Sequence, residues 1–469
     1  MKSRFTVFSI LTLTAVACIP VVAQKSSDVH VWLTAPDRSS LLALQPTSPK
    51  FSTTSSSAPV IQIHGQTKLQ SIDGFGFALT GGSAQLLMKM DAASRSTLLH
   101  QIFEKSDNGI DASYLRVSIG SSDMNDHVFS YDDVPTGQID PDLKKFSIEP
   151  DRADVIPVLK EILAIQPHIK ILASPWSPPA WMKTNGNPTG GNLKTEDYAV
   201  YANYFVKYVQ AMQAEGIVLD TITVQNEPLN PKNTPSMAML ADEQDIFISK
   251  YLGPAFQQAK IKTKILLYDH NPDVIMYAES ILRDPAASKY VDGTAFHLYG
   301  GEVSSLTKVH NDFPQKNLYM TEQLVAGRPH GNGIDVSSAL DRVLIGATRN
   351  WSKNVLLWNL AADPQNGPHT VGGCPVCQGL VTLDGNKVVS YNVGYYALAH
   401  FSKFVPPGSV HVETNEIEQL PDVAFQTPDG RTVLVVANTG NFHTEFQVAY
   451  HGKNFVTALE PGNVATYVW

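Results

Sequence analysis

Two glutamates stand where an apolar, strand-like run of the sequence gives way to polar residues. Glu227 closes the run that ends in QNEP at 225–228, and Glu322 follows the run 318–321. A carboxylate in such a place is costly unless it is hydrogen-bonded or used in chemistry. If the two runs face each other across one barrel, the two carboxylates meet at its mouth. Two facing carboxylates are what glycosidic-bond hydrolysis needs.

That chemistry requires one protonated and one ionised carboxyl group. The first donates a proton to the leaving oxygen, and the second attacks the anomeric carbon when the two lie about 5 Å apart. Repulsion at this distance raises the pKa of one partner. Asn226 could hydrogen-bond a sugar 2-hydroxyl, and Arg116, in an earlier strand-like run, could keep Glu322 ionised. The alternative from position alone is that both glutamates only pair with Arg or Lys at a barrel rim.

Aromatic and polar side chains end three further strand-like runs. Aromatic faces stack on the apolar face of a pyranose, while amides and histidine hydrogen-bond its hydroxyls. A single tryptophan is more often part of a core, but several at one end of a barrel favour a sugar pocket. The predicted sugar-binding residues are Trp176, Asn226, His297, Tyr299, Trp358 and Asn359.

Eight such runs, nearly all followed by a stretch of helical period, predict a (β/α)8 barrel. The predicted strands are 74–79, 114–119, 169–174, 221–225, 264–268, 294–297, 318–321 and 355–359. The predicted helices are 84–103, 153–165, 196–214, 243–259, 274–282 and 336–348, with a last segment at 392–404. A doubly wound open sheet would need a glycine-rich nucleotide loop with an acidic residue about 20 positions later. The GFG at 74–76 lacks that pattern.

The tail beyond about residue 409 changes to short strands separated by turns. These strands are predicted at 410–412, 423–425, 432–437, 445–449 and 464–469, joined by N-terminal strands at 29–34 and 60–63. The expected organisation is a signal peptide at 1–23, N-terminal strands of a β-sandwich at 24–70, a catalytic barrel at 71–405 and the rest of the sandwich at 406–469.

Composition excludes several other classes of protein. Hydrophobic residues make up 43% of the 469 residues, so disorder does not describe the bulk of the chain. The net charge of −9, with no basic run, argues against a nucleic-acid partner. No cofactor motif stands out, and no metal is expected.

The N-terminus has the features of a secretory signal. Lys2 and Arg4 precede an apolar stretch at 5–17, and VVA at 21–23 offers a cleavage site, so we expect an exported protein. A lipid anchor at Cys18 is the less favoured alternative, because the preceding AVA is a poor lipidation signal. No other run is long enough to span a membrane, and none is expected in the mature chain.

Two cysteines, Cys374 and Cys377, remain after the predicted signal and form a CxxC motif in a Gly/Pro-rich loop at 368–379. A structural zinc site would need two further ligands, and a thioredoxin-type site would place the motif at the start of a helix. In an exported protein a local disulfide is expected.

Several motifs together resemble glycoside hydrolase family 30, which includes the lysosomal glucosylceramidases. They are GFG at 74–76, LRV at 115–117, SPWSPPAWMKTN at 174–185, QNEP at 225–228, TE at 321–322 and WNL at 358–360. The resemblance implies a barrel with a side sandwich built from both termini, and a retaining β-glycosidase. It makes Glu227 the acid/base and Glu322 the nucleophile, with Trp176, Asn226, Tyr299 and Trp358 lining the first sugar site.

One departure concerns the substrate. The resemblance implies an aspartate after Thr80 that binds distal hydroxyls of the terminal glucose, whereas Gly81 and Gly82 follow here. Losing that acceptor is expected to open the site. The leading expectation is hydrolysis of a β-glucoside, a glycolipid or a β-glucan. An endo-β-1,6-glucanase, a β-xylosidase or a β-fucosidase are alternatives, and an inactive carbohydrate-binding surface protein is the alternative from another class.

Overall fold

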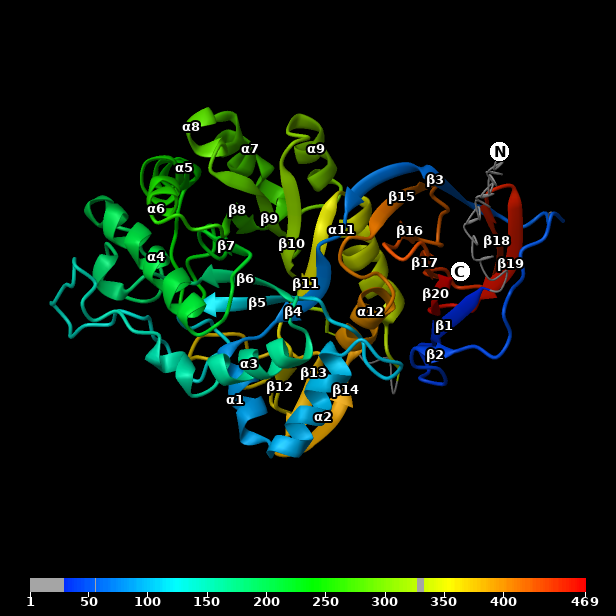
Figure 1. Ribbon diagram of the computed structural model, residues 1–469, viewed down its shortest axis with the longest axis horizontal. Helices are drawn as coiled ribbons and strands as arrows, with labels where there is room; N and C mark the ends of the chain where they lie inside the picture. The colour runs from blue at the N-terminus through cyan, green and yellow to red at the C-terminus, as the bar shows by residue number, and fades with distance from the viewer. Residues whose placement is uncertain (1–28, 55, 327–332) are drawn as a thin grey trace, which may run out of the picture.

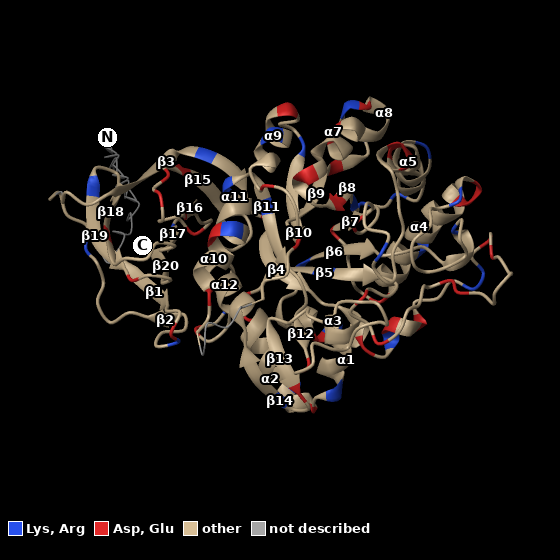
Figure 2. Ribbon diagram, turned by 180° about the vertical axis from the view of Figure 1, so that it is seen from behind, with Lys and Arg blue, Asp and Glu red and all other residues tan. Residues whose placement is uncertain are grey.

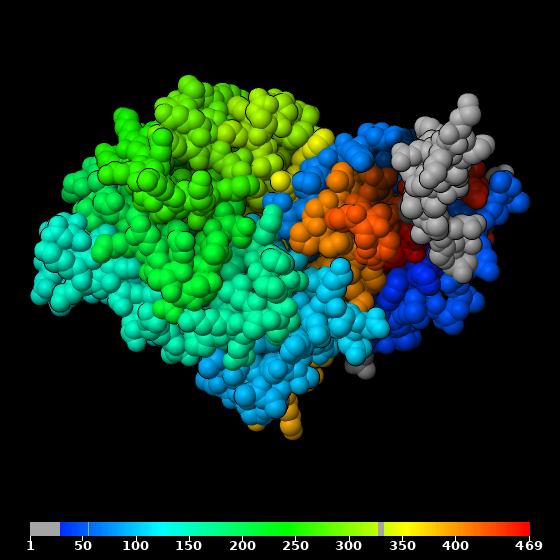
Figure 3. Space-filling model, in the orientation of Figure 1, coloured from blue at the N-terminus to red at the C-terminus, as the bar shows by residue number. Residues whose placement is uncertain are grey.

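The computed structural model describes residues 29–54, 56–326 and 333–469. Figures 1 and 3 show two lobes, a larger barrel with its helices and a smaller all-β lobe that contains both ends of the described chain. The predicted fold class, a (β/α)8 barrel with an associated sandwich, is confirmed. The predicted signal peptide and Cys18 lie outside the described residues.

Eight parallel strands close the barrel in the order β10-β11-β4-β5-β6-β7-β8-β9. Their bounds are β4 Gly74–Ala78, β5 Tyr114–Ile119, β6 Lys170–Pro175, β7 Thr221–Thr223, β8 Lys264–His270, β9 Val291–His297, β10 Asn317–Glu322 and β11 Ser352–Leu357. Side chains from six of these strands fill the barrel interior, namely Tyr114, Leu172, Leu266, Ala295, Tyr319 and Leu356. The barrel is therefore packed, and its chemistry must lie at the rim.

Helices follow the strands and cover the barrel. Their bounds are α1 Gly81–Lys89, α2 Ala92–Phe103, α3 Val155–Ile165, α4 Tyr198–Ala214, α5 Ala241–Phe247, α6 Gly253–Gln258, α7 Ile275–Arg283, α8 Pro285–Ser288, α9 Ser305–Asp312, α10 Val336–Ala339, α11 Gly346–Arg349 and α12 Val393–Ser402. The predicted helix 84–103 is two helices, because the Asp91 side chain accepts from the Ser94 amide and starts α2. Helix α9 was missed, since only Leu306 and Val309 of its eight residues are buried.

The all-β lobe is one sheet folded onto itself. Its order is β19-β18-β3-β15-β16-β17-β20-β1-β2. The bounds are β1 His30–Thr34, β2 Ala43–Leu44, β3 Val60–Ser71, β15 Val410–Thr414, β16 Asp422–Gln426, β17 Thr432–Ala437, β18 Thr444–Tyr450, β19 Lys453–Leu459 and β20 Val464–Val468. Strand β3 joins the two parts of this sheet, because its first residues pair with β18 and the rest with β15. Phe446 and Phe455 then pack on Tyr467, closing the sandwich core.

A small third sheet lies beside the barrel mouth. It consists of β12 Ala361–Ala362, β13 Val381–Asp384 and β14 Lys387–Tyr391, and sequence reasoning did not predict it. Strands β12 and β13 pair in parallel and bracket the loop that carries Cys374 and Cys377. The sheet thus fixes both ends of that loop at the rim.

The outer surface carries charges of both signs. Figure 2 shows the positions of basic and acidic residues on the same outer helices, for example on α7 and α9. Among the described residues, no helix has both the length and the apolar character needed to cross a membrane.

Candidate active site

Glu227 and Glu322 lie together at the carboxyl end of the barrel. Glu227 follows β7, and Glu322 is the last residue of β10. One oxygen of each carboxylate and one ring nitrogen of His297 lie within 4.8 Å of one another. Glu227 has a left-handed backbone, with φ of 44°, and its amide donates to the Asp269 carbonyl at 3.0 Å. At this separation one carboxylate can attack the anomeric carbon of a sugar while the other carboxyl group protonates the leaving oxygen.

Glu322 is held by two donors. The Arg116 guanidinium donates to Glu322 Oε2, and the Tyr299 hydroxyl donates to Oε1 at 2.9 Å. Arg116 is fully buried and also donates to Asn226 Oδ1 at 2.7 Å. The predicted role of Arg116 therefore extends to two site residues, because one guanidinium fixes both Glu322 and the amide of Asn226.

Asp269, at the end of β8, is the second partner of Arg116 and was missed by sequence reasoning. Its carboxylate accepts from Arg116 at 2.9 Å and from His297 at 3.1 Å. The hydroxyls of Thr223 and Thr321 donate to it at 2.7 and 2.6 Å. Burial raises the pKa of Asp269, but the charges of Arg116 and His297 outweigh burial and hold that pKa far below its usual value. The sequence LLYDH offered the same signal as the other strand ends, but the predicted strand stopped at residue 268.

His297 connects Glu227 to this buried network. Its Nδ1 lies 3.2 Å from Glu227 Oε1, and its Nε2 lies 3.1 Å from Asp269 Oδ1. Burial lowers the pKa of His297, yet the negative charges of Glu322, Asp269 and Glu227 raise it to about 10. His297 is thus a cation at neutral pH and contacts Glu227, while its own side chain is fully buried.

Repulsion between the two carboxylates is expected to raise the pKa of one of them, but the charge on His297 lowers the pKa of Glu227. Burial raises the pKa of Glu227, but the hydrogen bond and charge of His297, with a 2.8 Å bond from Asn230 Nδ2, bring it to about 2. The proton between these two groups therefore rests on His297. It lies one hydrogen bond away from the Glu227 carboxylate.

The two carboxylates open into a cavity of about 360 Å³. Trp176 and Trp358 form an aromatic pair on its wall, with ring centroids 5.6 Å apart. Tyr299 stands at the mouth, 42% exposed. The remaining lining residues are Asp123, Asn226, Asn230, Lys232, Asn233, Leu324, Gly372, Gly373, Cys374 and Cys377.

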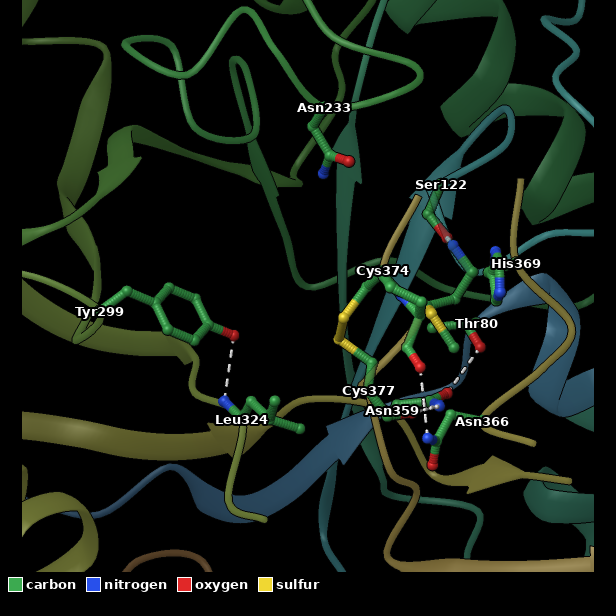
Figure 4. The surroundings of a disulfide bond; sticks show 12 residues. Thr80, Ser122, Asn233, Tyr299, Leu324, Asn359, Asn366, His369, Cys374 and Cys377 are labelled. Atoms are coloured by element: carbon green, nitrogen blue, oxygen red, sulfur yellow. Dashed lines mark hydrogen bonds between the residues drawn. A yellow bond between two sulfur atoms is a disulfide. The ribbon is translucent and has the colours of Figure 1, made fainter. Parts of the chain in front are cut away.

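The structure does not place Asn359 at this cavity. Its side chain is fully buried, and its Oδ1 accepts from Thr80 Oγ1 at 2.9 Å and from Ser83 Oγ at 2.7 Å. Its Nδ2 donates to the Cys377 carbonyl at 3.4 Å, as Figure 4 shows from the side of the disulfide. The predicted sugar contact of Asn359 is therefore replaced by a supporting role beneath the loop.

Asp123, in the loop after β5, is a cavity residue that the sequence reasoning missed. It is 5% exposed, and its Oδ1 has no hydrogen-bond partner among the described residues. Burial and the nearby charge of Glu322 raise the pKa of Asp123 to about 7. A Cβ at Gly81 would lie 1.8 Å from Asn125 Nδ2, so the space beside that glycine is filled. The expected opening of the site at Gly81 does not occur there, and Asp123 supplies a carboxylate from the loop after β5.

Glu227, His297 and Glu322 also form a grouping of metal-type donors in the described part of the chain. A cation there would have to compete with Arg116 and with the proton on His297. The arrangement favours proton transfer over metal binding.

The motifs that build this site match those of a known family along almost the whole described chain. The model of the glycosyl hydrolase family 30 TIM-barrel domain matches residues 72–405, and that of the family 30 beta sandwich domain matches 408–467. This chain belongs to glycosyl hydrolase family 30. The family 30 chain is therefore a glycoside hydrolase.

Relatives of two specificities resemble this family 30 member. An endo-1,6-beta-D-glucanase of Aspergillus fumigatus is 35% identical over 398 residues, 79% of each chain. The lysosomal acid glucosylceramidase of Mus musculus is 30% identical over 439 residues, 87% of this chain and 83% of that one. The solved structure of the endo-beta1,6-glucanase BT3312 is 33% identical, with a TM-score of 0.86, and covers 94% of this chain and 99% of that one.

Proposed function

We propose that this enzyme hydrolyses β-1,6-linked glucan with retention of configuration, with Glu322 as the nucleophile and Glu227 as the acid/base. The observation that carries the mechanism is the approach of the two carboxylates to within 4.8 Å, which leaves no room for the separation of an inverting enzyme. The choice of substrate rests on the endo-1,6-glucanase relatives and on the polar groups around the acid. Asn230, Lys232 and Asn233 line that side of the cavity and suit a hydroxylated leaving group.

In the first step, Glu322 attacks the anomeric carbon while Glu227 protonates the leaving oxygen. Glu227 obtains this proton from His297 Nδ1, 3.2 Å away, once a bound sugar displaces water and raises the pKa of the carboxylate. Forming the glycosyl ester removes the charge of Glu322, which is one of the charges that keep His297 protonated. The proton therefore leaves His297 most easily when the reaction needs it.

In the second step, Glu227 acts as the base. It takes a proton from a water molecule, which attacks the anomeric carbon and releases Glu322. The product has the original anomeric configuration, and the proton returns to the Glu227–His297 pair. Trp176 and Trp358 provide the aromatic wall for the sugar during both steps.

The two roles are tested by two substitutions with aryl β-glucosides of differing leaving groups. Glu322→Gln should abolish turnover while the variant still folds with a cooperative thermal transition. Glu227→Ala should spare the first step for substrates with good leaving groups, and azide should restore the second as a β-glycosyl azide. Near-normal rates in Glu322→Gln, or equal loss on all substrates without azide rescue, would contradict the assignment.

The substrate is tested by the products released from soluble β-1,6-glucan over time. Early oligosaccharides of mixed length would support endo cleavage, whereas glucose alone would mean exo action from a closed pocket. Sugar binding without any hydrolysis after long incubation would instead favour a carbohydrate-binding protein.

A glycolipid is the second candidate substrate. Val371 is 96% exposed and precedes the cysteines of the loop at the cavity, and Val376, between the two cysteines, is 65% exposed. Exposed apolar side chains at a cavity mouth suit an alkyl leaving group. Faster release of glucose from glucosylceramide micelles than from β-1,6-glucan would favour this candidate.

We also propose that the chain is exported, on the strength of its N-terminal 23 residues. Mass spectrometry of the mature protein should find Gln24 as the first residue. A lipid-modified Cys18 would support the anchored alternative, and an intact Met1 would refute export by cleavage.

A further inference from the structure

The cavity wall contains a disulfide. Cys374 and Cys377 are bonded, as predicted, and both line the cavity together with the catalytic glutamates. Figure 4 shows the bond at the cavity, with Tyr299 and Leu324 on one side and Asn359 and Asn366 on the other. We call residues 372–377 the disulfide loop.

The disulfide loop packs against the aromatic wall. Cys377 is 6% exposed and forms an apolar cluster with Ala78, Met124, Trp176 and Trp358. Cys374 lies at the margin of the same cluster. The half-cystine Cys377 thus forms part of the backing on which the Trp358 ring rests.

The segment that leads into the loop lies directly on the backbone of Asp123. The Thr370 amide donates to the Asp123 carbonyl at 2.8 Å, and the Gly373 amide donates to the Thr370 carbonyl at 3.0 Å. A Cβ at Gly373 would lie 2.5 Å from that Asp123 carbonyl oxygen, so only glycine permits this approach. Thr370 Oγ1 also donates to the Thr234 carbonyl at 2.5 Å, beside Asn233.

Within the described residues, few hydrogen bonds hold the tip of the loop, and one of them joins the Gln378 amide to the Val376 carbonyl at 2.9 Å. Asn366 Nδ2 donates to the Pro375 carbonyl at 3.3 Å and Asn359 Nδ2 to the Cys377 carbonyl at 3.4 Å, both long hydrogen bonds. Val376, at the tip, is largely exposed and contributes no core. The covalent bond is therefore the main constraint on the conformation of this loop.

We propose that the Cys374–Cys377 disulfide positions the sugar-binding wall of the active site. By closing the loop, it positions the Asp123 carboxylate and the Trp358 ring against the sugar next to the scissile bond. Opening it weakens sugar binding and leaves Glu227, Glu322 and Arg116 in place, because in the described part of the chain their side-chain hydrogen bonds and ion pairs do not involve residues 372–377. The identity of that sugar as glucose rests on the proposed function, but the role of the disulfide does not.

The experiment compares KM and kcat of the wild type with those of the double variant Cys374→Ser/Cys377→Ser on an aryl β-glucoside and on β-1,6-glucan. We expect KM to rise about tenfold on both substrates and kcat to change less than about twofold. Val389→Ser is the matched control, since it alters an exposed residue of β14 that does not line the cavity, and its KM should equal that of the wild type. Dithiothreitol on the folded wild type should reproduce the rise in KM and should not affect the double variant.

An unchanged KM in both the double variant and the reduced wild type would overturn the proposal, as would a fall in kcat at constant KM. If the double variant lacks a cooperative thermal transition, the reduced wild type decides, with circular dichroism as the check on its fold. If the wild type cleaves a different β-glycoside only, the proposed function fails, and the same KM comparison is made on that glycoside. If it cleaves none, the Kd of gentiobiose from calorimetry replaces KM, and an equal Kd overturns the proposal.

Discussion

Replacing Asp269 with Asn tests whether the buried network sets the protonation of the site. Asparagine has nearly the same shape, but its NH2 group cannot accept hydrogen bonds. Whichever way the amide turns, one pair of donors, either Arg116 with Thr223 or His297 with Thr321, loses its acceptor. Because Asp269 is fully buried, breaking this ion pair should lower the free energy of unfolding by about 3–5 kcal/mol.

The same substitution should shift the pH at which kcat/KM falls on the alkaline side of its pH profile. Without the negative charge of Asp269, the protonated form of His297 is stabilised less. The pKa of the proton shared by His297 and Glu227 therefore falls. Loss of a close opposite charge changes a pKa by about 1–3 units. Since the acid must carry this proton, the alkaline limb of kcat/KM should shift to lower pH by that amount.

The assay is kcat/KM on an aryl β-glucoside from pH 4 to 10, with thermal unfolding of both proteins at each pH. Asp151→Asn is the matched control. Asp151 is also buried, but burial raises its pKa to about 7, and its partner is the hydroxyl of Tyr131, outside the cavity. The control should keep the wild-type limb. An unchanged limb in Asp269→Asn, or a shift to higher pH, would refute this account of the proton.

Two further predictions follow from Tyr299 and His297. Tyr299→Phe removes the 2.9 Å hydrogen bond to Glu322 and should lower kcat/KM by about 10–100-fold; wild-type kinetics would mean that this bond does not steer the nucleophile. The raised pKa of His297, about 10 against 6.5 unfolded, stabilises the folded state fully below pH 6.5, and this contribution is lost as the pH rises to about 10. The wild-type Tm should therefore fall more between pH 6.5 and 10 than the Tm of His297→Gln, and parallel curves would contradict the charged His297.

The sequence predicted the barrel well because each strand is a short apolar run that ends in polar residues. It predicted Glu227 and Glu322 by the same rule. The failure at Asn359 has a geometric cause: this residue lies beyond the end of β11 with a left-handed φ of 57°, and its side chain accepts from Thr80 and Ser83. Glu227 also has a left-handed φ, of 44°, but its side chain lines the cavity. Nothing in the residue types reveals such a backbone angle.

Asp269 and Asp123 were missed for another reason. Their roles depend on partners from distant strands. Asp123 lies in no motif that marks it, and Asp269 lies just beyond the predicted end of its strand. Asp123 accepts no hydrogen bond at Oδ1, so it differs from an ordinary loop aspartate only through the burial that the tertiary structure imposes. Burial of a loop residue is the property that periodicity predicts least well.

The pairing of β1 with β20 has a consequence for how the protein is made. His30 is opposite Val468, so the two strands are separated by almost the entire chain. Contacts between residues close in the sequence form quickly, but β1 and β20 cannot pair until both strands are available. During synthesis the N-terminal strands therefore remain without their partner until the last residues emerge, and their exposed edge is a site for aggregation. A chain that stops before β20 would complete its barrel strands and leave the sandwich open.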